Sequence, residues 1–265
     1  MQQPQLPDML ERWQATLGWQ PSLAQQESFQ YLYEAILEGN RQLNLTRILA
    51  PDEFWEKHLW DSLNGIREWL DRGLPGEKLQ QRGDRAAADA LKGEPNPPFK
   101  VIDIGTGGGF PGLPVAIAQP CWSVTLLDST RKKIAFLDRV IKRLDIPNAQ
   151  TWVDRAELVG HHPQHREAYD LALIRAVASP SVCAEYALPL LKLGGKAILY
   201  RGQWSEAEAI ELEQAAQQLG AMVTAIVPSK TPLSQSIRHA IHLQKVNPTP
   251  SQFPRAVGIP SQNPL

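Results

Sequence analysis

The sequence has few cysteines and no long apolar run. Of its 265 residues only Cys121 and Cys183 are cysteine, and they lie far apart. This count excludes a disulfide framework and a C-x-x-C metal knuckle, and it fits a reducing compartment. No apolar run approaches the ~18 residues that a membrane span needs. The first residues also lack a basic-then-apolar signal segment, so we expect a cytoplasmic protein that does not enter a membrane.

An excess of charge of either sign is also missing. The 27 basic and 28 acidic residues give a formal net charge of −1. No global positive field therefore marks the chain as a nucleic-acid binder, and any RNA-binding surface must be a local patch. Hydrophobic residues make up 43% of the chain, which is enough to bury a full core at this length.

A glycine-rich loop follows a short β-branched run in residues 101–112. The nearly continuous apolar residues of 101–104 predict a buried parallel strand. Glycine tolerates positive φ and lets another molecule approach the main chain. The sequence therefore predicts a ligand site against the backbone at the end of this strand.

Two classes of ligand compete for this loop. A dinucleotide fingerprint requires G-x-G-x-x-G, and Phe110 stands where its third glycine belongs. The pattern here is D-x-G-x-G-G-G, which begins at Asp103 and resembles the first motif of S-adenosylmethionine (SAM) methyltransferases. SAM carries a sulfonium cation and no phosphate, so it tolerates a carboxylate at the loop mouth better than a pyrophosphate does.

A second strand supports the binding of a nucleoside-containing cofactor. Residues 122–128 predict a buried strand that ends in Asp128, 23 residues beyond Gly105. An acid about 20 residues after such a loop is the usual partner of ribose hydroxyls in βαβ nucleotide folds. The same side chain can also cap the helix that follows, and the two roles are compatible.

The remaining segments predict a doubly wound α/β fold with additions at both ends. Residues 1–72 predict a helical N-terminal extension, with Ser22 as the N-cap of one helix, and residues 73–98 an insertion rich in Pro, Gly and charge. Strands and helices alternate over 99–246, which predicts a mostly parallel, seven-stranded, Rossmann-like sheet. Its last two strands lack room for a crossover helix, so we expect an antiparallel edge pair. Residues 247–265, rich in Pro, Ser and Gln, predict a disordered tail.

Two groups of residues imitate catalytic or metal centres. His58, Asp61 and Ser62 lie one turn apart on a predicted helix, where a hydrolase triad cannot easily be aligned, and no G-x-S-x-G elbow exists. A capped, partly buried helix end is the simpler interpretation. The three histidines of residues 161–165 lie in a polar loop without a carboxylate or thiolate at ligand spacing. We therefore predict no metal site.

Basic residues gather on one predicted helix and at two strand ends. The helix of residues 131–144 carries six Lys and Arg residues on its outer face. They form either a solvated surface or a patch that contacts phosphates. Arg175 ends a buried strand, where ligands bind in this fold, and is either a functional cation or half of a structural ion pair. Arg201 ends the following strand.

Taken together, these segments resemble one known family, the RsmG (GidB) methyltransferases of small-subunit ribosomal RNA. The resemblance covers about residues 22–245. It implies a SAM-dependent methyltransferase that consists of this sheet and a helical N-terminal extension. The implied reaction is methylation of N7 of a guanine in the decoding-region loop of small-subunit (16S) rRNA. The insertion is longer than the family pattern, and Tyr200-Arg201-Gly202 replaces a usual Lys-Gly pair. The matching motifs are Asn44-Leu45-Thr46, His58-Leu59-Trp60-Asp61-Ser62-Leu63, residues 103–112, Leu127-Asp128-Ser129, and Arg175-Ala176 with Ala178.

The resemblance also implies roles for single residues. His58, Arg175 and Arg201 are candidates to face the substrate, and no catalytic acid or base is expected because guanine N7 already offers a lone pair. The expected partner is small-subunit rRNA or the assembling subunit, bound by a monomer. The implied contacts with SAM are Gly105, Phe110, Asp128, Ser129, Thr130, Ala156, Glu157 and Arg175.

Three other functions stay open on the sequence. The near-zero net charge permits a SAM methyltransferase of a small molecule. The glycine loop permits a nicotinamide oxidoreductase. A ribosome-binding module with a vestigial pocket would bind RNA without transferring a methyl group.

Overall fold

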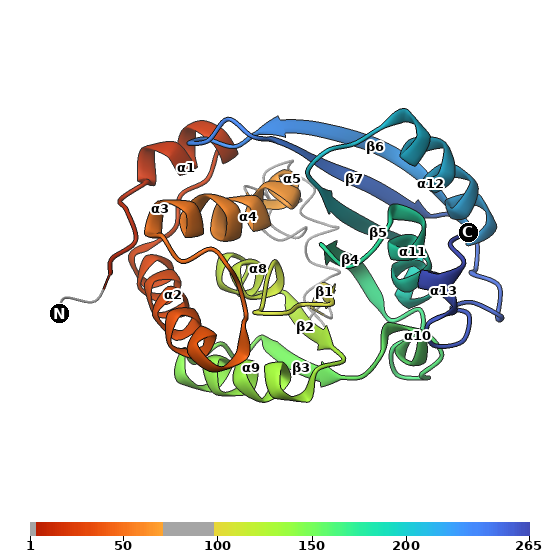
Figure 1. Ribbon diagram of the computed structural model, residues 1–265, viewed down its shortest axis with the longest axis horizontal. Helices are drawn as coiled ribbons and strands as arrows, with labels where there is room; N and C mark the ends of the chain where they lie inside the picture. The colour runs from red at the N-terminus through yellow and green to blue at the C-terminus, as the bar shows by residue number, and fades with distance from the viewer. Residues whose placement is uncertain (1–3, 71–97) are drawn as a thin grey trace, which may run out of the picture.

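The computed structural model describes residues 4–70 and 98–265, which form one seven-stranded sheet with helices on both faces (Figure 1). The predicted insertion at 73–98 lies outside the described residues apart from Pro98. Among the described helices, none combines the length and apolarity of a bilayer-spanning segment. The strands are β1 (Lys100–Ile104), β2 (Ser123–Asp128), β3 (Ala149–Val153), β4 (Tyr169–Arg175), β5 (Leu191–Arg201), β6 (Ala221–Lys230) and β7 (Ile237–Lys245).

The strand order is β3-β2-β1-β4-β5-β7-β6. The first five strands are parallel, and β7 runs antiparallel to both β5 and β6. The predicted mostly parallel, doubly wound sheet is therefore confirmed, as is the antiparallel pairing of the last two strands. The earlier of these two strands, β6, forms the sheet edge. The pairing of β4 with β5 shifts register between Tyr169 and Leu171, and on β5 Gly194 adopts a φ of +82°.

Alternate strand residues divide the core between the two faces of the sheet. On β1, Val101 packs into one apolar cluster, while Ile102 and Ile104 pack into the other. This division covers both faces, as a buried parallel sheet requires. The first cluster contains the N-terminal helices, α8 (Gly112–Ala118) and α9 (Arg131–Arg143); the second contains α10 (Ala156–Val159), α11 (Pro180–Ala187) and α12 (Glu206–Gln218).

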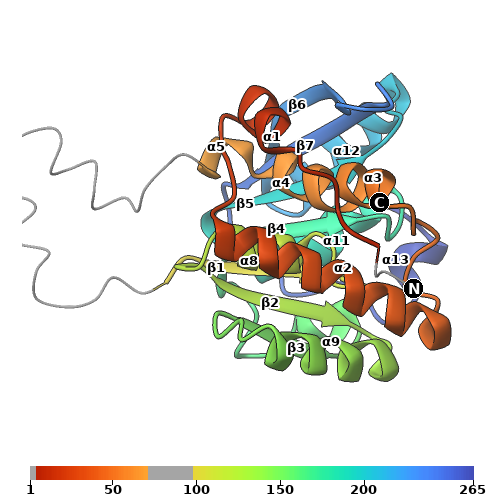
Figure 2. The ribbon, with the colours of Figure 1, turned by 90° about the vertical axis from the view of Figure 1, so that its left-hand side faces the viewer.

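The N-terminal helices lie over the first face (Figure 2). α2 packs against α8 and α9, and α4 packs against α8. Ser22 caps α2 as predicted, since its Oγ accepts a hydrogen bond from the Gln25 N–H and the Gln25 side chain accepts one from the Ser22 N–H. The helical segments are α1 (Leu10–Leu17), α2 (Leu23–Leu43), α3 (Pro51–Phe54), the π-helix η1 (Trp55–Trp60), α4 (Asp61–Gly65) and α5 (Arg67–Leu70).

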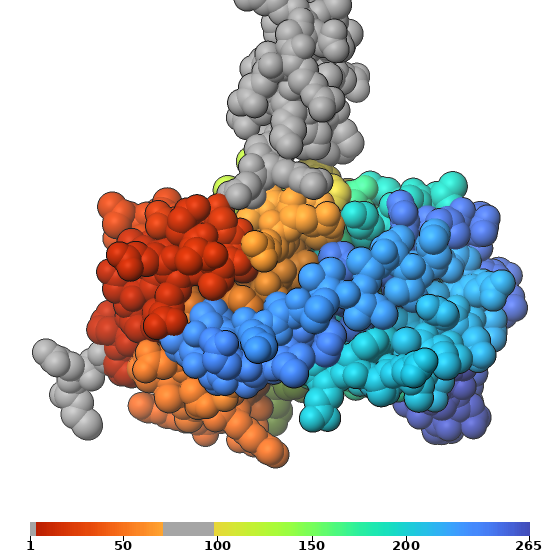
Figure 3. All heavy atoms as spheres, turned by 90° about the horizontal axis from the view of Figure 1, so that it is seen from above, coloured from red at the N-terminus to blue at the C-terminus, as the bar shows by residue number. Residues whose placement is uncertain are grey.

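The hairpin between β6 and β7 fastens these helices to the sheet. In Figure 3 it extends across the N-terminal helices. Glu56 of η1 is buried, and its Oε1 accepts the N–H groups of Leu233 and Ser234 at 2.5 and 2.8 Å. Burial raises the pKa of Glu56, but the hydrogen bonds from the hairpin outweigh it and hold the pKa below its usual range. The carboxylate therefore stays ionised and binds the hairpin tip.

The structure corrects the disordered tail predicted for residues 247–265. Phe253 is buried in the second cluster, and the short helix α13 (Ile259–Gln262) lies beside α11 (Figure 1). The Arg255 guanidinium pairs with the buried Glu185 carboxylate, with Nη2 and Oε2 2.6 Å apart. The polar composition of this segment does not predict its order, because partners such as Glu185 and Arg166 lie 70 or more residues earlier in the chain.

We expect Arg255→Ala to lower the free energy of unfolding by about 3 kcal/mol, because it leaves the fully buried Glu185 carboxylate without its ion-pair partner. The control is Arg143→Ala, which breaks an exposed ion pair with Glu38 and should have a far smaller effect. Urea unfolding at pH 7 measures both. Equally small losses would contradict the packed C-terminal segment.

Candidate functional site

A buried carboxylate holds the glycine loop against the end of β1. Asp103 is fully buried, and its Oδ2 accepts hydrogen bonds from Thr106 Oγ1 at 2.6 Å and from the Gly112 N–H at 2.8 Å. Burial raises the pKa of this carboxyl group to about 6. A Cβ at Gly112 would lie 2.2 Å from Leu126 Cδ2, so only glycine lets the chain pass this close. Hydrogen bonds to the Asp103 side chain therefore hold the loop in place, and the glycine at position 112 allows its close packing.

Asp128 at the end of β2 supports the same loop. Its Oδ2 accepts the Gly107 N–H at 3.0 Å, and its Oδ1 accepts the Thr130 N–H at 2.8 Å. Gly105 and Gly107 adopt positive φ values of 71° and 59°, which a side chain would disfavour. The carboxylate therefore connects the glycine loop to the start of α9.

A cavity of about 170 Å³ lies where β1, β2 and β3 end. Three of the residues implied as SAM contacts by the resemblance, Phe110, Thr130 and Arg175, are outside its lining. The sequence reasoning missed Tyr186 of α11 and Ser261 of α13, which complete the wall from distant parts of the chain. The implied contacts that do line the cavity are Gly105, Asp128, Ser129, Ala156 and Glu157.

Glu157 lines this cavity and is fixed by several donors. Arg155 Nη2 lies 2.8 Å from its Oε1, which also accepts the Gly258 N–H at 3.1 Å and the Tyr186 hydroxyl at 3.3 Å. Burial raises the pKa of Glu157, but the hydrogen bonds from Arg155 and Gly258 outweigh it and hold the pKa below its usual range. Its side chain is therefore an ionised part of the wall.

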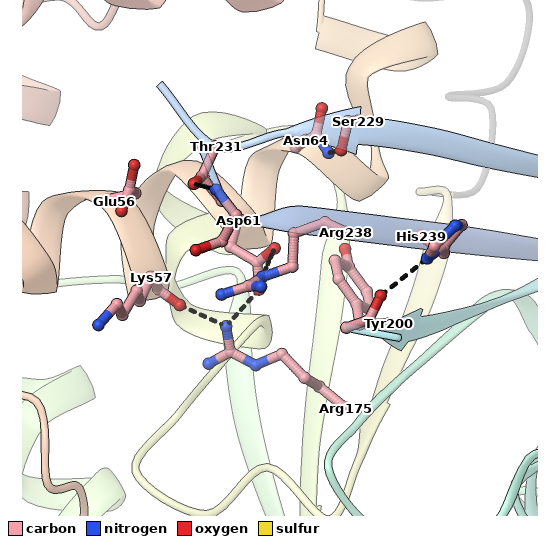
Figure 4. A network of polar contacts seen from close by, with 12 residues as sticks. Glu56, Lys57, Asp61, Asn64, Arg175, Tyr200, Ser229, Thr231, Arg238 and His239 are labelled. Carbon is pink, nitrogen blue, oxygen red and sulfur yellow. Dashed lines mark hydrogen bonds and ion pairs between the residues drawn. The ribbon is translucent and has the colours of Figure 1, made fainter. Parts of the chain in front are cut away.

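Arg175 reaches toward the N-terminal helices (Figure 4). Its Nη1 donates to the Lys57 carbonyl at 2.9 Å and to Asp61 Oδ2 at 3.1 Å. On the other side of Asp61, Arg238 Nε of β7 lies 3.6 Å from Oδ1. The ion-pair alternative for Arg175 is thus realised, and this contact joins β4 to the N-terminal helix.

His58 is buried beside Arg175 and stacks on Phe110, with ring centroids 4.3 Å apart. Its Nδ1 faces Arg175 Nη2 at 3.2 Å, and its Nε2 lies 2.7 Å from Thr46 Oγ1. A guanidinium only donates, so Nδ1 accepts and Nε2 carries the proton. Burial and the charges of Arg175 and Lys57 lower the pKa of His58 to about 3, which keeps the ring neutral.

The geometry of the other polar groups excludes a hydrolase triad. The Ser62 hydroxyl donates to the His58 backbone carbonyl and not to its ring, and Asp61 is paired with Arg175.

Arg201, the other candidate to face the substrate, donates to the Ala178 carbonyl at 3.0 Å and to Glu208 Oε1 at 2.8 Å. Within residues 4–70 and 98–265, no cluster of His, Cys, Asp and Glu could hold a metal ion.

The family of the chain follows from comparison with known proteins. The model of the GidB family, described as rRNA small subunit methyltransferase G, matches residues 25–73 and 86–239. The chain belongs to the GidB family. The resemblance deduced from the motifs is therefore confirmed, and the gap in the match falls within the insertion predicted at 73–98.

Relatives of this GidB chain match it along most of its length. The "Ribosomal RNA small subunit methyltransferase G" of Nostoc punctiforme is 56% identical over 260 residues, 98% of each chain. That of Trichodesmium erythraeum is 52% identical over 98% of this chain and 94% of its own. Among solved structures, a 16S rRNA (adenine(1408)-N(1))-methyltransferase from Catenulisporales acidiphilia gives a TM-score of 0.48 at 14% identity, over 57% of this chain and 86% of its own.

We expect the His58 ring to make stability depend on pH. Its pKa is lower in the folded chain, about 3, than its ordinary 6.5, so the unfolded chain binds more protons between these values. The contribution of His58 is complete above pH 6.5 and is lost as the pH falls toward 3, at no more than about 1.4 kcal/mol per pH unit. Urea unfolding between pH 7 and 5 should show a steeper loss for the unsubstituted chain than for His58→Gln. Parallel pH profiles would contradict a neutral buried ring.

Proposed function

We propose that this chain transfers a methyl group from SAM to N7 of a guanine in the decoding-region loop of small-subunit (16S) rRNA. One observation carries the proposal: a cavity at the ends of β1 and β2 has the Asp128 carboxylate in its wall, beside a glycine loop. Membership of the GidB family supports the reaction and the RNA substrate.

The chemistry of the cavity suits the adenosyl part of SAM. A carboxylate offers about four acceptor sites, and backbone N–H groups occupy one site on each oxygen of Asp128, so the carboxylate can still accept two ribose hydroxyls. The cavity of about 170 Å³ is open and is smaller than most small-molecule sites, so we expect the methionine part of SAM to lie outside it, over the glycine loop. The Asp103 carboxylate at the start of this loop disfavours a pyrophosphate there.

Methylation of guanine N7 requires positioning and no general base. The N7 lone pair lies in the plane of the base, so it can attack the methyl group without losing a proton. The bond from N7 to the methyl carbon forms as the bond from that carbon to sulfur breaks, which leaves a neutral thioether and a cationic base. Catalysis then rests on holding N7, the methyl carbon and sulfur in line.

The arginines at the strand ends are candidates to hold the guanine. Within the described residues, Arg175 uses three of its five N–H groups, on Lys57, Asp61 and His58. The other two can donate to guanine O6 or to a phosphate while N7 stays free for attack. In the same described part of the chain, Arg201 uses two of its five N–H groups, on the Ala178 carbonyl and on Glu208, which leaves three donors for the same purpose.

The outer face of α9 supplies the local positive patch that the near-neutral chain needs. Its basic residues are solvent-exposed except for the half-buried Lys133. Such a cluster can neutralise several phosphates and makes RNA binding fall steeply with salt. The residues of this patch are Arg131, Lys132, Lys133, Arg139, Lys142 and Arg143.

The test is to incubate the protein with methyl-labelled SAM and small-subunit rRNA, either free or in the assembling subunit, and to map the labelled base. We expect label at N7 of one guanine in the decoding region. Asp128→Asn should reduce transfer and weaken S-adenosylhomocysteine binding about tenfold or more, because the amide nitrogen cannot accept hydrogen bonds. Calorimetry measures the affinity.

The matched control is Asp52→Asn on α3, which makes the same change at an exposed position outside the cavity lining and should keep both transfer and affinity. Binding of RNA and SAM without labelled base would overturn the reaction in favour of a non-catalytic module. Labelling of a small molecule and not of RNA would overturn the substrate.

A further inference from the structure

The C-terminal segment, residues 247–265, reaches the cofactor cavity from beyond the part of the chain that the family model matches. That match ends at residue 239, whereas Ser261 lines the cavity together with Ala156 and Glu157. Nothing in the glycine loop or the Asp128 strand requires such a segment.

Hydrogen bonds connect this segment directly to Glu157 in the cavity lining. The Gly258 N–H donates to Glu157 Oε1 at 3.1 Å, and the Tyr186 hydroxyl donates to the same oxygen at 3.3 Å. The Tyr186 and Ser261 hydroxyl oxygens are 3.1 Å apart. Because the single Tyr186 proton goes to Glu157, Ser261 must be the donor in that last contact.

The segment is held in place at three further points. Arg255 binds the buried Glu185 carboxylate through its backbone N–H and its guanidinium. Arg166 donates to the carbonyls of residues 249 and 253, at 3.0 and 2.8 Å. A Cβ at Gly160 would lie 2.4 Å from Pro254 Cγ, so the segment lies directly against the turn after α10. These contacts make a fixed wall rather than a loose end.

We propose that this segment forms the outer wall of the cofactor cavity and that the small Ser261 side chain leaves room for the adenine of SAM. The inference rests on the function proposed above. With the ribose on Asp128, the base extends toward the loop after β3, where Ala156 and Glu157 lie. Ser261 lines the same cavity, and its hydroxyl is connected to Glu157 through Tyr186, so the size of residue 261 decides whether an adenosyl ligand fits.

The test compares Ser261→Phe with Ser251→Phe, the same change at an exposed position of the same segment outside the cavity lining. Calorimetry with S-adenosylhomocysteine should show binding about tenfold or more weaker for Ser261→Phe and unchanged binding for Ser251→Phe. In the labelled-methyl assay, Ser261→Phe should raise KM for SAM and leave kcat nearly unchanged. Melting temperatures without ligand should agree among the variants.

Equal affinities for Ser261→Phe and Ser251→Phe would overturn the wall and leave the proposed function standing. No binding of S-adenosylhomocysteine by the unsubstituted protein would overturn both. If Ser261→Phe does not fold, hydrogen exchange on the unsubstituted protein decides: bound S-adenosylhomocysteine should slow exchange across residues 255–262. An unchanged exchange rate there would overturn the wall.

Discussion

The site depends on the Asp103 carboxylate, which is buried with the glycine loop wrapped around it. Burying a charged carboxylate is costly unless hydrogen bonds compensate, and here the Thr106 hydroxyl and the Gly112 N–H provide them. Its second oxygen, Oδ1, has no partner among the described residues, in keeping with a pKa that burial raises to about 6. The same contacts fix the loop beside Asp128, so the cavity exists because the loop cannot relax away from β1.

The two ends of the chain stabilise this loop region from opposite faces of the sheet. On one face, the N-terminal helices reach β4 through the contact of Asp61 with Arg175, and His58 stacks on Phe110 of the loop. On the other face, residues 247–265 reach Glu157 through Gly258. The strand ends that form the cavity therefore lie between the N-terminal helices and the C-terminal segment. Each of these two parts of the chain contributes a fixed polar contact.

The sequence was sufficient for features that depend on local pattern or short spacing. The β-branched runs predicted the central strands, the lack of a crossover predicted the antiparallel pair, and Ser22 predicted a helix start. Contacts between distant segments could not be deduced in this way. The position of Arg175 at a strand end indicated a costly buried charge, but it did not identify Asp61 as the partner. In the same way, the composition of residues 247–265 did not predict the contact with Glu185. Tyr186 and Ser261 line the cavity although both are distant in sequence from the motifs that predicted the site.

A crystal structure with S-adenosylhomocysteine tests most directly whether the strand ends bind the cofactor. The chain has a second, larger cavity of about 670 Å³, which lies between the N-terminal segment and α2 and is lined by Trp13, Phe29 and Trp55. The predicted result is a ligand in the smaller cavity, with both ribose hydroxyls on the Asp128 carboxylate and the adenine beside Ala156. A ligand in the larger cavity, with Asp128 bound only to Gly107 and Thr130, would contradict it.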